Sequence, residues 1–224
     1  HNANFLPFYE QSKKIGFNIK YVDLNKEGQI TVENFKKSLT KKTKVVSLTY
    51  ISNVFGYITP IQEIAEICRQ NNITLIIDAA QAATRVKIDM QKLNCDFLVF
   101  SAHKTYGPNG LGVLAGRLSS LKKLKEYEYG GQMVESLDLK EVVYNKAPDN
   151  LEAGTPAISQ AISFQESLKF LMNIGMENIE KHENELTKFA FLKLKKIKEV
   201  ILYTKKPESG IISFNVQGVH PHDA

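Results

Sequence analysis

The chain has 224 residues, of which 43% are hydrophobic and 24% are charged. This length is sufficient for one large domain, or for one domain and part of another, around a sizeable core. The net charge of +5 comes from lysines scattered among acidic residues, without the basic, aromatic-rich stripe of a nucleic-acid interface. No apolar run approaches the ~18 residues of a membrane span. We therefore expect neither nucleic acid nor membrane as a partner.

Two cysteines, Cys68 and Cys95, indicate free thiols in a reducing compartment and not a disulfide framework. We expect a cytoplasmic protein, with the lumen of an organelle as the alternative. No signal-peptide pattern opens the chain. The chain starts without methionine and stops after His220-Pro221-His222-Asp223-Ala224 without a closing element. We therefore expect it to be a segment of a longer protein.

Apolar patterns predict helices and strands that alternate along the first hundred residues. Helices are expected over 4–15, 31–39 and 59–71, and strands over 17–22, 44–50, 73–77 and 97–100. The third helix has Thr59 as its cap, Pro60 at its first position and Gln62 as the partner in a capping box. This alternation predicts an α/β sheet, mostly parallel and buried on both faces.

The second half of the chain predicts a change of organisation. Gly112 to Leu114 reads as a further strand, parallel or antiparallel, and 126–153 as a long functional loop region. Thr155 and Pro156 are typical of a helix start. Helices to about Leu171 and over 177–196 are then followed by strands at 200–203 and 211–216. We expect a large domain over 1–172 and the start of a smaller α+β domain over 173–224.

Polar side chains follow three of the predicted strands. Asn53 comes soon after the second strand, Asp78 ends the third, and the cluster 101–104 follows the fourth. Ligands of parallel sheets bind beyond the carboxyl ends of the strands. Lys104, held between His103 and a glycine-rich turn, has the chemistry to form a Schiff base. For a lysine in isolation, a solvated position after a strand is the more common explanation.

Asp78 needs a partner, because a carboxylate at the end of an apolar strand is costly to bury alone. A pyridinium nitrogen would suit it, since the carboxylate keeps that nitrogen protonated; capping of the next turn is the alternative. Gln81 could donate to a phenolic oxygen of the same ligand, or be a plain turn amide. The candidate phosphate donors are Ser101, His103 and Thr155, the last because helix N-termini favour anions.

Six short runs together resemble the class V aminotransferase family of fold-type I pyridoxal 5'-phosphate (PLP) enzymes. They lie at 1–4, 51–56, 78–82, 96–108, 152–156 and 220–223. Within the family the chain is similar to cysteine desulfurases of the sulfur-mobilisation type, close to the selenocysteine lyases. The resemblance covers essentially all 224 residues. It implies a central mostly parallel sheet flanked by helices, with 1–172 as the PLP-binding domain.

The resemblance also implies roles for individual residues. Lys104 holds PLP covalently and moves the Cα proton of the substrate. His1 stacks on the ring and acts as an acid–base group, and Asn53 orients the ring or the substrate. Asp78 pairs with the pyridinium nitrogen, and Ala80 packs under the ring.

The remaining contacts that the resemblance implies reach the periphery of PLP. Gln81 contacts the phenolic oxygen. Ser101 and His103 bind the phosphate. Thr155 binds the phosphate of the partner subunit across a homodimer.

The implied reaction converts L-cysteine to L-alanine and leaves a persulfide on an enzyme cysteine, supplying sulfur for iron–sulfur cluster assembly through an acceptor protein. The nucleophilic cysteine and the arginine for the substrate carboxylate are expected beyond Ala224, and further phosphate donors before His1. No metal is expected. Selenocysteine lyase, or another class V lyase, is one alternative; a non-catalytic interaction module is the other.

Overall fold

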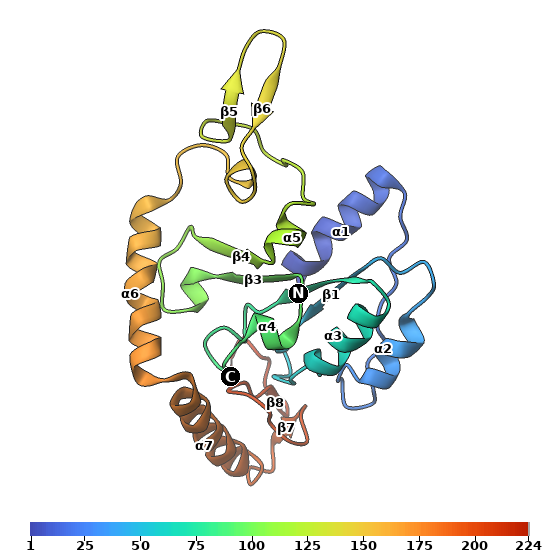
Figure 1. Cartoon of the computed structure of the whole chain (residues 1–224). Coiled ribbons are helices and arrows are strands. Elements are labelled where there is room, and N and C mark those ends of the chain that lie inside the picture. The colour runs from blue at the N-terminus through green and yellow to red at the C-terminus, as the bar shows by residue number, and fades with distance from the viewer. Residues whose placement is uncertain (224) are drawn as a thin grey trace.

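The structure is a computed structural model that describes residues 1–223. Its centre is a four-stranded sheet in the order β1-β2-β3-β4 (Figure 1). The first three strands are parallel and β4 is antiparallel to β3. The strands of this sheet are β1 (Val45–Thr49), β2 (Thr74–Asp78), β3 (Phe97–Ser101) and β4 (Gly112–Gly116). The predicted mostly parallel sheet is confirmed.

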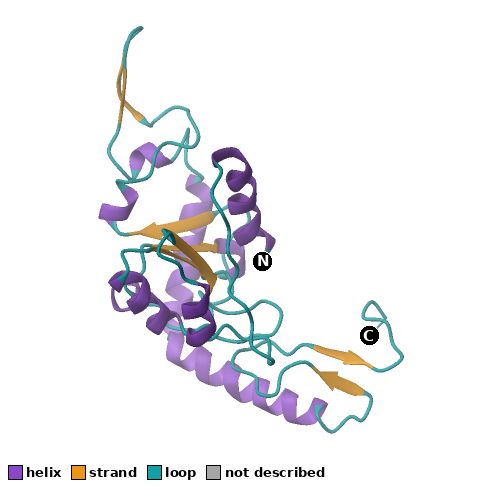
Figure 2. Ribbon diagram, turned by 90° about the vertical axis from the view of Figure 1, so that its right-hand side faces the viewer, coloured by secondary structure: helices purple, strands orange, loops and turns teal. Residues whose placement is uncertain are grey.

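Two small antiparallel pairs stand at opposite ends of the molecule (Figure 2). They are β5 (Val134–Leu137) with β6 (Val142–Tyr144), and β7 (Val200–Leu202) with β8 (Phe214–Val216). The helices are α1 (Asn2–Ile15), α2 (Val32–Ser38), α3 (Ile61–Gln70), α4 (Met90–Leu93), α5 (Leu118–Leu121), α6 (Ile158–Ile174) and α7 (Met176–Leu194), with 3-10 turns η1 (Ala102–Lys104) and η2 (Asp149–Leu151). No helix within residues 1–223 is both long and apolar enough to cross a membrane.

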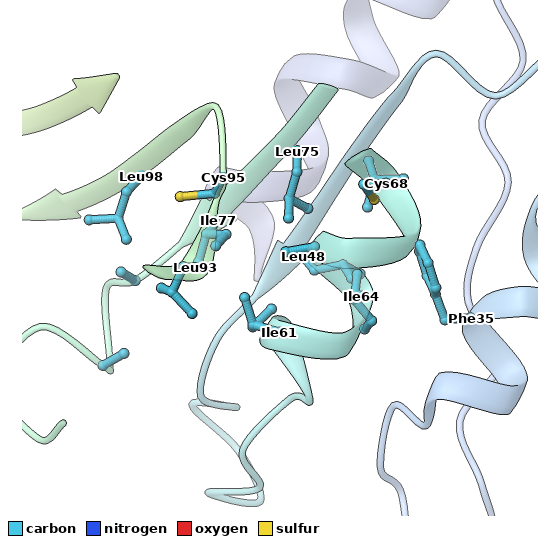
Figure 3. Close-up of a cluster of buried hydrophobic side chains, with 14 of the residues drawn as sticks. Phe35, Leu48, Ile61, Ile64, Cys68, Leu75, Ile77, Leu93, Cys95 and Leu98 are labelled. Carbon is cyan, nitrogen blue, oxygen red and sulfur yellow. The ribbon is translucent and has the colours of Figure 1, made fainter. Parts of the chain in front are cut away.

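The hydrophobic core lies between α3 and one face of the sheet (Figure 3). The register aligns Leu48 with Ile77 and Ile77 with Leu98, so their side chains share that face. Ile64 of α3 and Ile77 of β2 are completely buried. Burying a side chain of this size stabilises the fold by roughly 1.5–3 kcal/mol. The α3–sheet contact therefore fixes where the strands end.

The other face of the sheet is only partly covered. Helix α1 lies on it, opposite α3 (Figure 3), and Ser47 Oγ donates to Asn4 Oδ1 at 2.5 Å. Val45, Val99 and Leu114 on this face are 49%, 36% and 51% exposed. The expectation that both faces are buried is therefore wrong for the described residues. The exposed face is the one toward which Asp78 points.

Two predicted features of the chain are wrong. Residues 17–22 form no strand, because alternation sets the faces of a strand but does not provide a neighbour for it to pair with. The region 126–153 is not all loop, since it contains the β5–β6 hairpin.

The capping box predicted at α3 is also wrong. The helix begins at Ile61 with Pro60 as its cap, and no side chain caps it. Thr59 is buried, and its backbone N–H donates to the Tyr50 carbonyl at 2.8 Å. A tertiary contact has therefore displaced the local signal. The division of the chain at residue 172 stays a prediction.

Ile64→Ala should lower the free energy of unfolding by about 2–5 kcal/mol, because it removes a fully buried side chain and leaves a cavity. Urea unfolding followed by circular dichroism measures the change. Gln62→Ala is the matched control, since Gln62 is exposed on the same helix and makes no cap. A loss for Gln62→Ala as large as that for Ile64→Ala would contradict this account of α3.

Candidate active site

Lys104 lies in a short turn that leaves the sheet directly after β3. The N–H groups of Thr105 and Gly107 both donate to the Ala102 carbonyl, at 2.7 and 2.8 Å. Thr105 Oγ1 donates to the Ser101 carbonyl at 3.1 Å. These bonds close the 3-10 turn η1 around the lysine. The backbone of Lys104 is therefore held close to the end of a central strand.

Helix α6 supports this turn from outside. Ser167 Oγ donates to the carbonyl of Tyr106, a residue with a positive φ of 57°, at 2.9 Å. A Cβ on Gly107 would lie 2.5 Å from Phe164 Cδ2 and 2.9 Å from the Ala102 carbonyl. Only glycine therefore permits the turn to pack this closely against α6. The sequence predicts the glycine-rich turn, but nothing in the sequence indicates that α6 packs against it.

Asp78 ends β2, the strand next to β3. Its Cα pairs with Thr49 on one side and Val99 on the other, on the face opposite the core. The carboxylate accepts the Ala80 N–H at 3.0 Å, so the turn-capping interpretation is confirmed. A carboxylate has about four lone-pair positions, which leaves Asp78 able to accept from a ligand as well. Ser101 lies two residues beyond Val99 on the same face.

His1 caps α1, the helix on this same face. Its Nδ1 accepts the Ala3 N–H at 3.1 Å, so Nε2 carries the proton of the neutral ring. The imidazole is exposed. Asn53 is also exposed, in the turn after β1, where the Ser52 hydroxyl accepts backbone N–H groups. Both side chains are accessible to a ligand.

The remaining predicted site residues lie after β2, after β3 and before α6. Ala80 and Gln81 are half-buried after β2, and His103 is exposed beside Lys104. Thr155 is exposed and does not cap α6, which begins at Ile158 with no side-chain cap. The predicted helix start at Thr155 is therefore wrong, because the turn at residues 154–157 intervenes. Its expected contact with a partner subunit stays a prediction.

Neither cysteine is suited to be a nucleophile. Burial raises the pKa of Cys68 to about 11, and the charge of Asp96 adds to the effect. Burial also raises the pKa of Cys95. Both are free thiols, buried in the core. Among residues 1–223, no group of three or more His, Cys, Asp or Glu side chains is placed to hold a metal ion.

The model of the family described as "Aminotransferase class-V" matches residues 1–224. The chain belongs to the class V aminotransferase family. A probable cysteine desulfurase of Halalkalibacterium halodurans is 39% identical over 223 residues, which is all of this chain and 55% of that protein. A cysteine desulfurase of Wigglesworthia glossinidia brevipalpis is 37% identical over 225 residues. The chain thus spans about half the length of the curated relatives that it matches.

Solved structures agree with this assignment. The cysteine desulfurase CsdA from Escherichia coli superposes with a TM-score of 0.95 at 28% identity, covering all of this chain and 56% of that one. A cysteine desulfurase from Thermococcus onnurineus gives a TM-score of 0.94 at 31% identity, also over 56% of its length. The predicted fold-type I class, a mostly parallel sheet flanked by helices, is confirmed.

Gly107→Ala should destabilise the turn after Lys104 by about 1–3 kcal/mol, because the new methyl group overlaps Phe164 and the Ala102 carbonyl. The midpoint of urea unfolding measures this. Adding Phe164→Leu should restore part of the loss by removing the nearest ring atom. Gly112→Ala is the control, since its Cβ would meet nothing closer than 4.0 Å; equal losses at both glycines would contradict the packing argument.

Cys68 and Cys95 should resist iodoacetamide in the folded protein at pH 8. At that pH a thiol with a pKa of about 11 is ionised in roughly one molecule in a thousand, and burial excludes the reagent. Mass spectrometry of the two cysteine peptides measures the labelling, with urea-unfolded protein as the control that labels rapidly. Rapid labelling of Cys68 in the folded protein would show that it is neither buried nor protonated.

Proposed function

We propose that the chain is the PLP-binding part of a cysteine desulfurase, which converts L-cysteine to L-alanine and passes the sulfur to an enzyme cysteine outside this chain. The observation that carries the proposal is the placement of Lys104 and Asp78 at the ends of neighbouring strands β3 and β2. Curated relatives at 37–39% identity with the name cysteine desulfurase support the same reaction.

The donor set fits PLP. It combines a lysine amine and a carboxylate with hydroxyl, imidazole and amide groups at one edge of the sheet. Within residues 1–223 the side chains of Lys104, His103 and Gln81 make no hydrogen bond or ion pair with the protein. These groups are therefore free to bind a ligand. When bound, PLP supplies an electron sink that stabilises a carbanion at the substrate Cα.

Each predicted site residue has a defined role in this proposal. Lys104 holds the cofactor covalently and then takes the proton from the substrate Cα. The Asp78 carboxylate keeps the pyridine nitrogen protonated, which maintains the electron-withdrawing form of the ring. His1 covers the ring from the side of α1 and exchanges protons through Nε2. Asn53 orients the substrate side.

The other predicted residues contact the ring face, the phenolic oxygen and the phosphate. Ala80 packs beneath the ring, and Gln81 donates to the phenolic oxygen. The phosphate is bound by Ser101 and His103. Thr155 reaches the phosphate of the partner subunit in a homodimer.

The wider role that we propose is sulfur supply to an acceptor protein for iron–sulfur cluster assembly. The persulfide requires a reactive, mobile thiol. Cys68 and Cys95 do not suit this role, because both are buried in the core and burial raises the pKa of each thiol. Cys68 and Cys95 form no disulfide, which is the usual pattern in a reducing compartment and supports the cytoplasmic location that we propose.

Lys104→Ala in the complete protein should abolish the absorbance of lysine-bound PLP. It should also lower alanine release from cysteine by at least about 100-fold, since the proton-transfer group at Cα is lost. Lys122→Ala, an exposed lysine at the end of α5, is the control and should leave both readouts unchanged. Turnover retained in folded Lys104→Ala protein would refute the mechanism.

Parallel assays with cysteine and selenocysteine identify the substrate. With a thiol reductant present, which reduces the persulfide and releases its outer sulfur as sulfide, we expect sulfide and alanine from cysteine. Alanine from selenocysteine alone would favour a selenocysteine lyase. PLP absorbance without turnover of either amino acid would favour a non-catalytic module.

A further inference from the structure

The loop that carries Asn53 is a small hairpin. Its base is closed by a backbone bridge between Ile51 and Ile58. Ser52 N–H donates to the Tyr57 carbonyl at 3.0 Å, and the Ser52 hydroxyl accepts from Val54 and Phe55. Asn53 itself, at the tip, is exposed. The position of Asn53 therefore depends on what holds the hairpin from outside.

A segment from the other end of the chain, residues 208–213, holds it. Three of its side chains bind the backbone of the hairpin, one at the base, one midway and one at the tip. Glu208 Oε2 accepts from Ile58 N–H at 2.9 Å, Ser209 Oγ donates to the Gly56 carbonyl at 2.8 Å, and Ser213 Oγ donates to the Val54 carbonyl. The contact with Val54 is directly next to Asn53.

The fit between the two segments is close enough to require glycine. Gly56 is buried and has a φ of +68°. A Cβ there would lie 2.8 Å from Ser209 Oγ and 2.9 Å from both Cβ and the carbonyl oxygen of Ile211. The contact with Ile211 is independent of the three hydrogen bonds, and it points to the same alignment of the segment against the hairpin.

The hydrogen bond that Glu208 accepts is the strongest of the three between the segment and the hairpin. Glu208 is half-buried, and its charged carboxylate bonds a backbone N–H at the hairpin base, a type of hydrogen bond that is stronger than a neutral one. Its other oxygen, Oε1, accepts from Gln29 Nε2 at 3.1 Å. Gln29 makes no hydrogen bond with the hairpin among the described residues, since its other partner is Asn25. The two hydrogen bonds of Glu208 are therefore separable by mutation.

We propose that Glu208 is a positioning residue for the cofactor site: with Ser209 and Ser213 it fixes the hairpin 51–58, and thereby Asn53. This inference rests on the proposed function, because it takes Asn53 as a ligand of the PLP–substrate complex. Glu208 acts through the backbone of the hairpin and touches no reacting atom. The segment 208–213 thus determines the geometry of a site whose chemistry lies on the strand ends.

Two measurements test this in the complete protein. Hydrogen exchange of the peptide that covers 51–59, in cofactor-free protein, reports the hairpin alone. The rate of PLP release from the loaded protein, followed by absorbance, reports the site. Glu208→Ala should accelerate both by about tenfold, since it leaves the Ile58 N–H without its partner. Ser213→Ala should accelerate exchange at the tip and raise the KM for cysteine more than it lowers kcat.

Conservative and control variants separate positioning from general destabilisation. Glu208→Gln retains an acceptor for Ile58 N–H and should restore slow exchange and slow PLP release. Gln29→Ala removes only the second contact of Glu208, and Lys205→Ala removes an exposed ion pair with Glu27 in the same region. Both should behave like the parent protein.

The outcomes are distinct. Unchanged exchange in Glu208→Ala, or equal effects in Gln29→Ala, would overturn the proposal. Faster exchange with unchanged PLP release would show that the hairpin is held but does not position the site, which also overturns it. In either case Lys104→Ala would still lose its absorbance if the proposed function is correct. A parent protein that binds no PLP would overturn both.

Discussion

The site depends on one constraint, the pairing of β3 on both sides. Parallel β2 and antiparallel β4 bond its two edges, so the point at which the chain leaves the sheet cannot slide. The same ladder sets Asp78 level with Val99, two residues before Ser101. A shift of one residue would turn Asp78 into the core face. The backbone register therefore positions the lysine and the carboxylate, without any need for a side-chain contact between them.

The parts of the fold that the sequence predicts well are those with local causes. The strands β1, β2 and β3 are short apolar runs followed by polar residues, and each was expected within two residues of its bounds. Residues 17–22 carry the other strand pattern, an alternation of apolar and polar residues, but pair with no neighbouring strand among the described residues. Thr59 has the chemistry of a cap, yet its backbone pairs with Tyr50. In both cases a tertiary contact, or its absence, decides the structure.

The same distinction applies to the site. Lys104, Asp78 and Asn53 could be proposed from the sequence because each lies at the end of a strand or within a few residues of it. Their supports could not, since the Tyr106–Ser167 bond spans 61 positions and the Gly56–Ser209 bond spans 153. Hydrophobic periodicity gives no information about contacts between residues that lie so far apart in the sequence. The one signal available is a glycine in an unexplained place, and Gly56 and Gly107 both mark a close approach of another segment.

Close contacts also cross the proposed boundary at residue 172. Arg85, a few residues after the Asp78 loop, pairs with Glu183 of α7 at 2.9 Å, with both side chains mostly buried. A Cβ on Gly210 would overlap Arg85 Nη1 and lie 3.0 Å from Glu183 Oε2. Two glycines, Gly56 in the loop after β1 and Gly210 in the segment itself, let the segment 208–213 pass between the loops after β1 and β2. The contacts at Gly56 involve the backbone and Cβ of Ile211, and such close packing tolerates little adjustment. We therefore expect a displacement of the C-terminal segment to move the loop after β1, and with it Asn53.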